Sequence, residues 1–167
     1  MAAALIYLDT NLLVPLFVLE RECARIRQWV HDQETLFCVS IWSRVELRSA
    51  LGLKVRIGEL TQRQADDSHE TFEQSFLPSL KEWPIERRHF ARSVGLLKNA
   101  RSGLSGPDAL HLAVCLDGGG VTLATSDANL FKVAKAFHQK GHIRRCICAT
   151  VARYPFNRLC AGSIAVK

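Results

Sequence analysis

Short apolar runs alternate with longer stretches of helical periodicity along most of this 167-residue chain. The first three runs, 5–8, 36–40 and 121–125, each end at or just before a small polar or acidic residue and lead directly into a helical segment. Apolar runs of about four to eight residues between polar boundaries are typical of buried strands. Strands that alternate with helices form parallel sheets with right-handed crossovers. The sequence therefore predicts an α/β fold, a three-layer α/β/α sandwich around a central parallel twisted sheet.

The first apolar run delivers a carboxylate to the edge of this sheet. Asp9 follows the run directly, and Thr10 and Asn11, which favour helix N-termini, come before a second apolar stretch with helical spacing. Open α/β sheets place their sites at such strand-to-helix turns. An unpaired carboxylate is costly to bury, so Asp9 is expected either to serve a site or to cap the next helix.

Three further acids occupy comparable positions. Glu46 lies about one turn into the helix that leaves the second strand, and Asp108 lies in the first turn of a helix that ends at a run of glycines. Asp127 repeats the pattern of Asp9, because it follows the third strand and precedes a helix. The carboxyl ends of parallel strands share one edge of a sheet, so the four acids are able to converge there.

The remaining segments carry weaker signals. Residues 61–76 open with a capping box and are polar on most faces, so we expect an exposed helical arm. Residues 78–84, bracketed by two prolines, are expected to be a connector. A helix over 86–98 follows, and we expect its apolar side chains to face inward, namely Phe90, Val94 and Leu97. Residues 144–149 are able to form a last strand.

Charge and cysteine content limit the class of protein. Lys and Arg number 22 against 16 Asp and Glu, for a net charge of +6, which is compatible with a polyanionic partner, although a basic surface also serves solubility alone. No apolar run reaches the length of a membrane span and no signal peptide is recognisable, so we expect a cytoplasmic protein with no membrane contact. Its six cysteines lack the C-x-x-C spacing of zinc sites and are expected to be reduced, mostly buried thiols.

Four carboxylates in one cleft repel one another unless a divalent cation lies among them. Oxygen-only ligands with room for water suit Mg²⁺ or Mn²⁺ rather than zinc. Such an ion orients and deprotonates water and stabilises charge on a phosphoryl group, as phosphodiester hydrolysis requires. The basic remainder of the chain would then hold a nucleic-acid backbone.

Four short motifs, taken together in this order and context, resemble PIN-domain ribonucleases, and specifically the VapC toxins of bacterial toxin–antitoxin pairs. The motifs are Tyr7-Leu-Asp9-Thr-Asn11, Ser43-Arg-Val-Glu46-Leu, Pro107-Asp108-Ala-Leu-His-Leu-Ala and Thr125-Ser-Asp127. The resemblance implies a Mg²⁺- or Mn²⁺-dependent endoribonuclease with an RNA substrate, a cognate antitoxin and a homodimeric assembly. By this resemblance the catalytic acids are Asp9, Glu46, Asp108 and Asp127, the metal ligands are Asp9, Asp108 and Asp127, and the supporting polar residues are Asn11 and Thr125.

The resemblance covers the chain from about Leu5 to Phe137 and guides the domain boundaries. We assign 1–145 to a PIN-like nuclease domain. Residues 146–167 are assigned to a basic C-terminal extension, or to a final strand plus a tail. This part is longer than the short ending usual in the family, so its function stays open.

Three other interpretations stay open at this point. A Mg²⁺-dependent phosphatase of another α/β class, the haloacid dehalogenase type, needs Asp-x-Asp after the first strand, where this chain has Asn11; a phospho-receiver domain needs paired acids that we do not find. A catalytically inactive PIN-like domain that binds RNA or protein would be favoured by a missing acid, but all four are present. The acids would otherwise be ordinary helix caps. For His111 we favour a packed or surface residue over a catalytic role.

Overall fold

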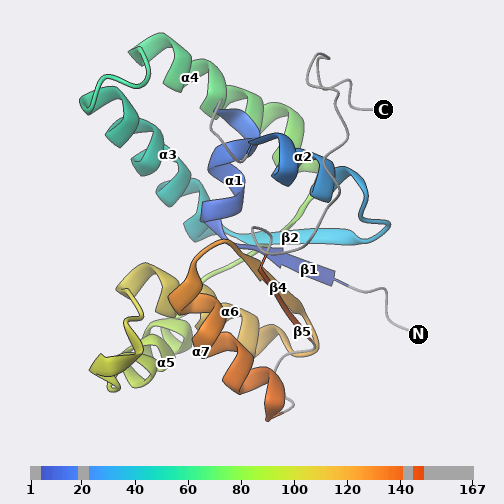
Figure 1. The fold of residues 1–167 in the computed structure, drawn as a ribbon, viewed down its shortest axis with the longest axis vertical. Helices are drawn as coiled ribbons and strands as arrows, with labels where there is room; N and C mark the ends of the chain where they lie inside the picture. Colours follow the sequence, from blue (N-terminus) through green and yellow to red (C-terminus); the bar gives the residue numbers. More distant parts are fainter. Residues whose placement is uncertain (1–4, 19–22, 141–144, 149–167) are drawn as a thin grey trace.

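A computed structural model of the chain describes residues 5–18, 23–140 and 145–148. Within these ranges the strands form one five-stranded, fully parallel sheet in the order β3-β2-β1-β4-β5 (Figure 1). The strands are β1 (Leu5–Leu8), β2 (Leu36–Ser40), β3 (Lys81–Trp83), β4 (Thr122–Thr125) and β5 (Arg145–Cys148). The predicted parallel α/β fold is confirmed, including the last strand.

Helices cover both faces of the sheet, which gives the three predicted layers (Figure 1). One face carries α1 (Thr10–Phe17), α2 (Cys23–His31), α3 (Ile41–Arg56) and α4 (Gln62–Thr71). The other carries α5 (Arg87–Leu97), α6 (Gly106–Gly118) and α7 (Ala128–Gln139). Short helical turns complete the connections, namely η1 (Phe72–Phe76), η2 (Leu77–Ser79) and η3 (Ala100–Ser102). Two clusters of buried apolar side chains fill the space between the sheet and each helical layer.

The central strand β1 defines the position of the site. Tyr7 pairs with Cys38 of β2 on one side, and Leu8 pairs with Ala124 of β4 on the other. The chain leaves β1 towards β2 and later returns to place β4 on the opposite side, so the crossovers diverge at the carboxyl end of β1. Open α/β sheets bind their ligands at such a point. Asp9 is the residue that follows β1 there.

The prediction that the apolar stripe of α5 faces inward is wrong. Phe90, Val94 and Leu97 are 53%, 65% and 37% exposed, respectively. The face that packs against α6 instead carries the buried His89, whose Nε2 atom lies 3.2 Å from Oδ2 of Asp117. A hydrophobic stripe predicts burial only where another element covers it, and within the described chain α5 is covered along its polar side.

The prediction of an exposed arm over residues 61–76 is only partly correct, because most of its side chains are exposed but Ala65 and Phe72 are buried. The capping box is present, because the Thr61 side chain accepts from the Gln64 backbone and the Gln64 side chain accepts from the Thr61 backbone. The segment nevertheless packs against the rest of this layer through Ala65 of α4 and Phe72 of η1, both in the core cluster that also contains residues of α1 and α3. These two residues lie two helical turns apart on one face, a signal that the polar majority of the segment obscured.

The connector at 78–84 contains the edge strand β3, which the sequence interpretation missed. Three residues are too few to show an alternating pattern. They are a strand because they pair with β2. Of the predicted C-terminal extension 146–167, residues 149–167 lie outside the described residues. No helix in the described ranges is long and apolar enough to cross a lipid bilayer.

Candidate functional site

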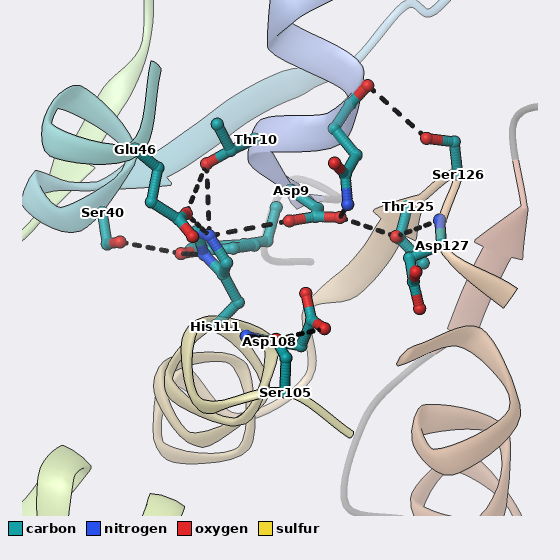
Figure 2. A network of polar contacts seen from close by, with 12 residues as sticks. Asp9, Thr10, Ser40, Glu46, Ser105, Asp108, His111, Thr125, Ser126 and Asp127 are labelled. Carbon is teal, nitrogen blue, oxygen red and sulfur yellow. Dashed lines mark hydrogen bonds and ion pairs between the residues drawn. The ribbon is translucent and has the colours of Figure 1, made fainter. Parts of the chain in front are cut away.

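A cleft of about 510 Å³ lies at the carboxyl edge of the sheet, and all four predicted acids line it. Asp9 comes from the end of β1, Glu46 from α3, Asp108 from the first turn of α6 and Asp127 from the start of α7. The structure therefore brings together the four acids that the sequence singled out. Figure 2 shows Asp9 in the middle of this arrangement, between Glu46 on one side and Asp127 on the other.

Asp9 stands at the N-cap position of α1, yet its side chain makes no capping hydrogen bond. Its Oδ2 atom accepts instead from Thr125 Oγ1 at 2.7 Å and from Asn11 Nδ2 at 3.1 Å (Figure 2). The carboxylate thus contacts the end of β4 and one side chain of α1 rather than the backbone N–H groups at the start of α1. Both predicted supporting residues contact the first acid, and their role in a reaction stays a prediction.

The surroundings of Asp9 raise its pKa. Burial is the largest cause, since the residue is 1% exposed. The charge of His111 and the hydrogen bond from Thr125 act in the opposite direction, and the negative charges of Asp108 and Glu46 add to the upward shift of this pKa. A bound cation would favour the ionised form of such a carboxylate.

Glu46 is held by two side chains through one of its oxygens. Oε2 accepts a hydrogen bond from Thr10 Oγ1 at 2.7 Å and is in direct contact with His111 Nε2. Partial burial acts to raise the pKa of Glu46, but the hydrogen bond and charge of His111, together with the bond from Thr10, outweigh it and leave this pKa below its usual value. Glu46 is therefore ionised at neutral pH.

His111 belongs to the same hydrogen-bond network and is only 1% exposed. Its Nδ1 atom lies 2.7 Å from the hydroxyl oxygen of Tyr7, which is also hydrogen-bonded to Ser40 Oγ at 2.8 Å. Its Nε2 atom lies 3.6 Å from Asp9 Oδ1. Of the two positions expected for it, packed or on the surface, His111 has the packed one, and its lack of a catalytic role stays a prediction. Its contact with the acids was missed. The available signal was its position one helical turn after Asp108, which places the two side chains on neighbouring parts of the α6 surface.

The two remaining acids have local partners. Asp108 Oδ2 accepts from Ser105 Oγ at 2.6 Å. Asp127 Oδ1 accepts from the backbone N–H of Leu130 at 2.7 Å and so caps α7. The helix-cap interpretation thus describes the contacts of Asp127 but not those of Asp9.

The chemistry of the donor set fits a hard divalent cation, because every acid that lines the cleft offers carboxylate oxygens. Among the described residues, however, no three His, Cys, Asp or Glu side chains are arranged to hold a metal ion as they stand. Coordination would therefore require rotation of acids such as Asp108, or water molecules between the carboxylates and the ion. Mg²⁺ usually retains several waters, so this arrangement is compatible with it.

The sequence pattern of the PIN domain matches residues 6–136 of this chain. The chain belongs to the PIN-domain family. The resemblance to PIN domains inferred from the four motifs is thereby confirmed. No curated protein sequence matches the chain significantly.

Solved structures of PIN domains and of toxin–antitoxin proteins share this fold. FitAcB from Neisseria gonorrhoeae is 23% identical over 78% of this chain and 93% of its own, with a TM-score of 0.61. The sarcin–ricin-loop-cleaving toxin VapC20 from Mycobacterium tuberculosis is 15% identical over 75% of this chain and 92% of its own, with a TM-score of 0.60. A toxin–antitoxin complex from Klebsiella pneumoniae is 21% identical over 84% of this chain and 95% of its own, with a TM-score of 0.51. At these identities the similarity concerns the fold.

Proposed function

We propose that this PIN domain is a Mg²⁺- or Mn²⁺-dependent endoribonuclease and the toxin of a toxin–antitoxin pair. The observation that carries the proposal is the convergence of Asp9, Glu46, Asp108 and Asp127 in one cleft of a PIN fold. The structural similarity to an RNA-cleaving toxin and to a toxin–antitoxin complex supports the choice of RNA as substrate and of an antitoxin as partner. An RNA substrate and a cognate antitoxin imply a cytoplasmic location.

The residues would divide the work as follows. Asp9, Asp108 and Asp127 would hold a metal ion, which when bound would lower the pKa of water and neutralise charge on the scissile phosphate. Thr125 fixes Asp9 by the hydrogen bond described above. Glu46, ionised at neutral pH, accepts a proton from the attacking water. The water oxygen bonds to phosphorus, the bond from phosphorus to the leaving ribose oxygen breaks, and that oxygen departs with a proton from solvent.

The cleft also offers surfaces for the rest of an RNA chain. Arg56 lies on its lining and is able to pair with a backbone phosphate. The net charge of +6 attracts a polyanion towards a cleft whose floor is acidic, so that the metal ion is the group that makes close approach of a phosphate favourable.

We further propose that the protein forms a homodimer through α3 and α5. Apart from Leu36 on β2, the large hydrophobic side chains that are exposed among the described residues lie on these two helices or at their ends, namely Ile41, Val45, Leu53, Ile57, Phe90, Val94 and Leu97. Although α3 and α5 belong to different helical layers, both lie at the left of the molecule in Figure 1. Exposed apolar groups of this extent mark interaction surfaces.

The proposal is tested by incubating purified protein with structured RNA in Mg²⁺, in Mn²⁺ and in a chelator. We expect cleavage only with metal, and a loss of at least about 100-fold in Asp9→Asn and Asp108→Asn, since a lost ligand removes several kcal/mol of charge stabilisation. Asp117→Asn is the control, because Asp117 pairs with Arg88 outside the cleft. Cleavage that survives exhaustive chelation would contradict the metal mechanism.

A second candidate, a catalytically inactive PIN domain that binds RNA or protein, gives a different outcome. It predicts that wild type binds RNA without cutting it under any metal condition. The phosphatase alternative predicts hydrolysis of small phosphate monoesters instead of RNA.

Expression in cells adds a further test of the toxin role: wild type is expected to arrest growth, and Asp9→Ala and Asp108→Ala are expected to relieve the arrest. Equal toxicity of wild type and both variants would mean that the acids are not responsible.

A further inference from the structure

We propose that His111 is a positioning residue that holds the Glu46 carboxylate in one orientation within the acidic cleft. The inference rests on the proposed nuclease function for its consequence in catalysis, but the arrangement itself is independent of that function. It explains why a fully buried histidine lies within a cluster of acids on a helix whose other buried residues are almost all apolar.

The hydrogen-bond inventory determines which group donates. Thr10 uses its hydroxyl proton for Glu46 Oε2. The other atoms that face His111 Nε2 belong to the carboxylates of Glu46 and Asp9, which only accept. Nε2 therefore carries a proton and donates it to Glu46, and it lies 3.6 Å from Asp9 as well.

The ring is fixed from behind by β1. Tyr7 is fully buried, and its hydroxyl joins His111 Nδ1 to Ser40 at the end of β2. The imidazole is thus held at both nitrogens, one by the sheet and one by the acids (Figure 2). A ring held in this way cannot turn its Nε2 atom away from Glu46 without breaking buried hydrogen bonds, which is costly.

The contact with His111 restricts the orientation of the Glu46 side chain. Its Oε2 atom accepts hydrogen bonds from Thr10 and His111, and its Oε1 atom makes neither of these contacts. A free glutamate has several rotamers, whereas this one is held in a single orientation beside the other acids. A proton acceptor that is already oriented gives a faster reaction than one that must find its position.

His111 itself does not line the cleft, whereas Glu46 does. His111 therefore acts through Glu46 rather than on substrate. This distinguishes a positioning residue from a general base, and it predicts an effect on kcat rather than on KM for RNA.

A matched pair of substitutions tests the donor. In His111→Gln the side-chain amide nitrogen lies near the Nε2 position, and in His111→Asn it lies near Nδ1. We expect His111→Asn to lose about 10- to 100-fold in kcat with little change in KM, as for other residues that orient a site from outside it. His111→Gln should recover most of that loss. Equal kcat in the two folded variants, whether high or low, would overturn the proposal.

His89→Asn is the control for the replacement of a buried histidine. His89 is also buried on a helix and contacts an acid, Asp117, but it lines a separate small cleft. We expect this variant to lose stability while kcat stays near the wild-type value. A similar loss of kcat in His89→Asn would show that the effect of His111 is a general effect of disrupted packing.

A measurement without RNA or metal separates this inference from the proposed function. Nitrogen NMR of ¹⁵N-histidine-labelled, metal-free protein at neutral pH is expected to show a protonated Nε2 for His111, assigned from the signal that is missing in His111→Gln. Its resonance should move in Glu46→Gln, while the resonances of His89 stay in place. An unprotonated Nε2, or a resonance indifferent to Glu46→Gln, would overturn the positioning role even if the protein cleaves RNA. The expected spectra together with no RNA cleavage would contradict the proposed function alone.

Discussion

The Nε2 atom of His111 contacts the Oε2 atom of Glu46 across 65 residues of sequence. His111 belongs to α6 and Glu46 to α3, helices on opposite faces of the sheet (Figure 1). The contact therefore passes over the carboxyl end of the central strand and joins the two helical layers beside Asp9. The candidate site therefore lies where both helical layers meet the carboxyl edge of the sheet.

Metal binding should be visible in the stability of the protein. Mg²⁺ that binds the folded state alone raises the melting temperature, and at a hundredfold excess over its Kd it adds about 2.7 kcal/mol, or about 5–10 °C for a domain of this size. We expect this increment to shrink in Asp9→Asn and Asp108→Asn and to persist in Asp117→Asn. Scanning calorimetry with and without Mg²⁺ measures it. Superimposed curves for every variant, also with a non-cleavable RNA present, would remove the basis for a metal site.

Two glycines in different surroundings should respond in opposite ways to alanine. A Cβ atom at Gly118 would lie 2.3 Å from the indole ring of Trp83, whereas one at Gly95 meets nothing within 4 Å. We expect Gly118→Ala to lower the free energy of unfolding by about 1–3 kcal/mol through overpacking. Gly95→Ala, in the last turn of α5, should raise it by up to about 1 kcal/mol. Urea titrations decide between this pattern and equal effects, which would mean that Trp83 does not pack against α6.

The thiol of Cys38 should be unreactive in the folded protein. Burial raises its pKa from 9.0 to about 12, while Lys81 lowers it slightly. Because the unfolded thiol ionises first, the stability contributed by this group is complete below pH 9 and is lost as the pH rises towards 12. At pH 8 we expect alkylation of Cys38 only after unfolding in urea, with the partly exposed Cys23 labelled earlier. Mass spectrometry of labelled peptides tests this, and rapid labelling of native Cys38 would contradict it.

A charge within the apolar stripe of α5 should dissociate the proposed dimer. Val94 is 65% exposed, so Val94→Lys leaves the folded monomer intact but places an unpaired ammonium in the contact. We expect the dimer Kd to rise by at least about tenfold, an effect of about 1.4 kcal/mol. Glu70→Lys on the exposed side of α4 introduces the same residue elsewhere and should leave association unchanged. Sedimentation equilibrium that finds wild type monomeric, or both variants dimeric, would refute the interface.

The local sequence pattern was sufficient to predict where the acids of the site lie in the fold. Asp9 and Asp127 each follow a short apolar run and precede a helix, and Asp108 follows a Ser-Gly-Pro helix start. The rule that parallel strands end at one edge then brings these acids together with Glu46 without knowledge of any distance. Local pattern failed for α5, because Phe90 and its neighbours are spaced like a core stripe whether or not another element covers them.

The sequence by itself determined the parallel sheet, its helical layers and the four acids at one edge, because each depends on periodicity or on chain direction within a short segment. Only the tertiary structure decided the long-range partners of Asp9 and Glu46. Tyr7 and Glu46 reach His111 from positions 104 and 65 residues away, and nothing in the immediate neighbours of His111 indicates either contact. A buried histidine obtains its function from the groups that packing places around it, and the packing of α3 and α6 over the end of β1 places two acids there.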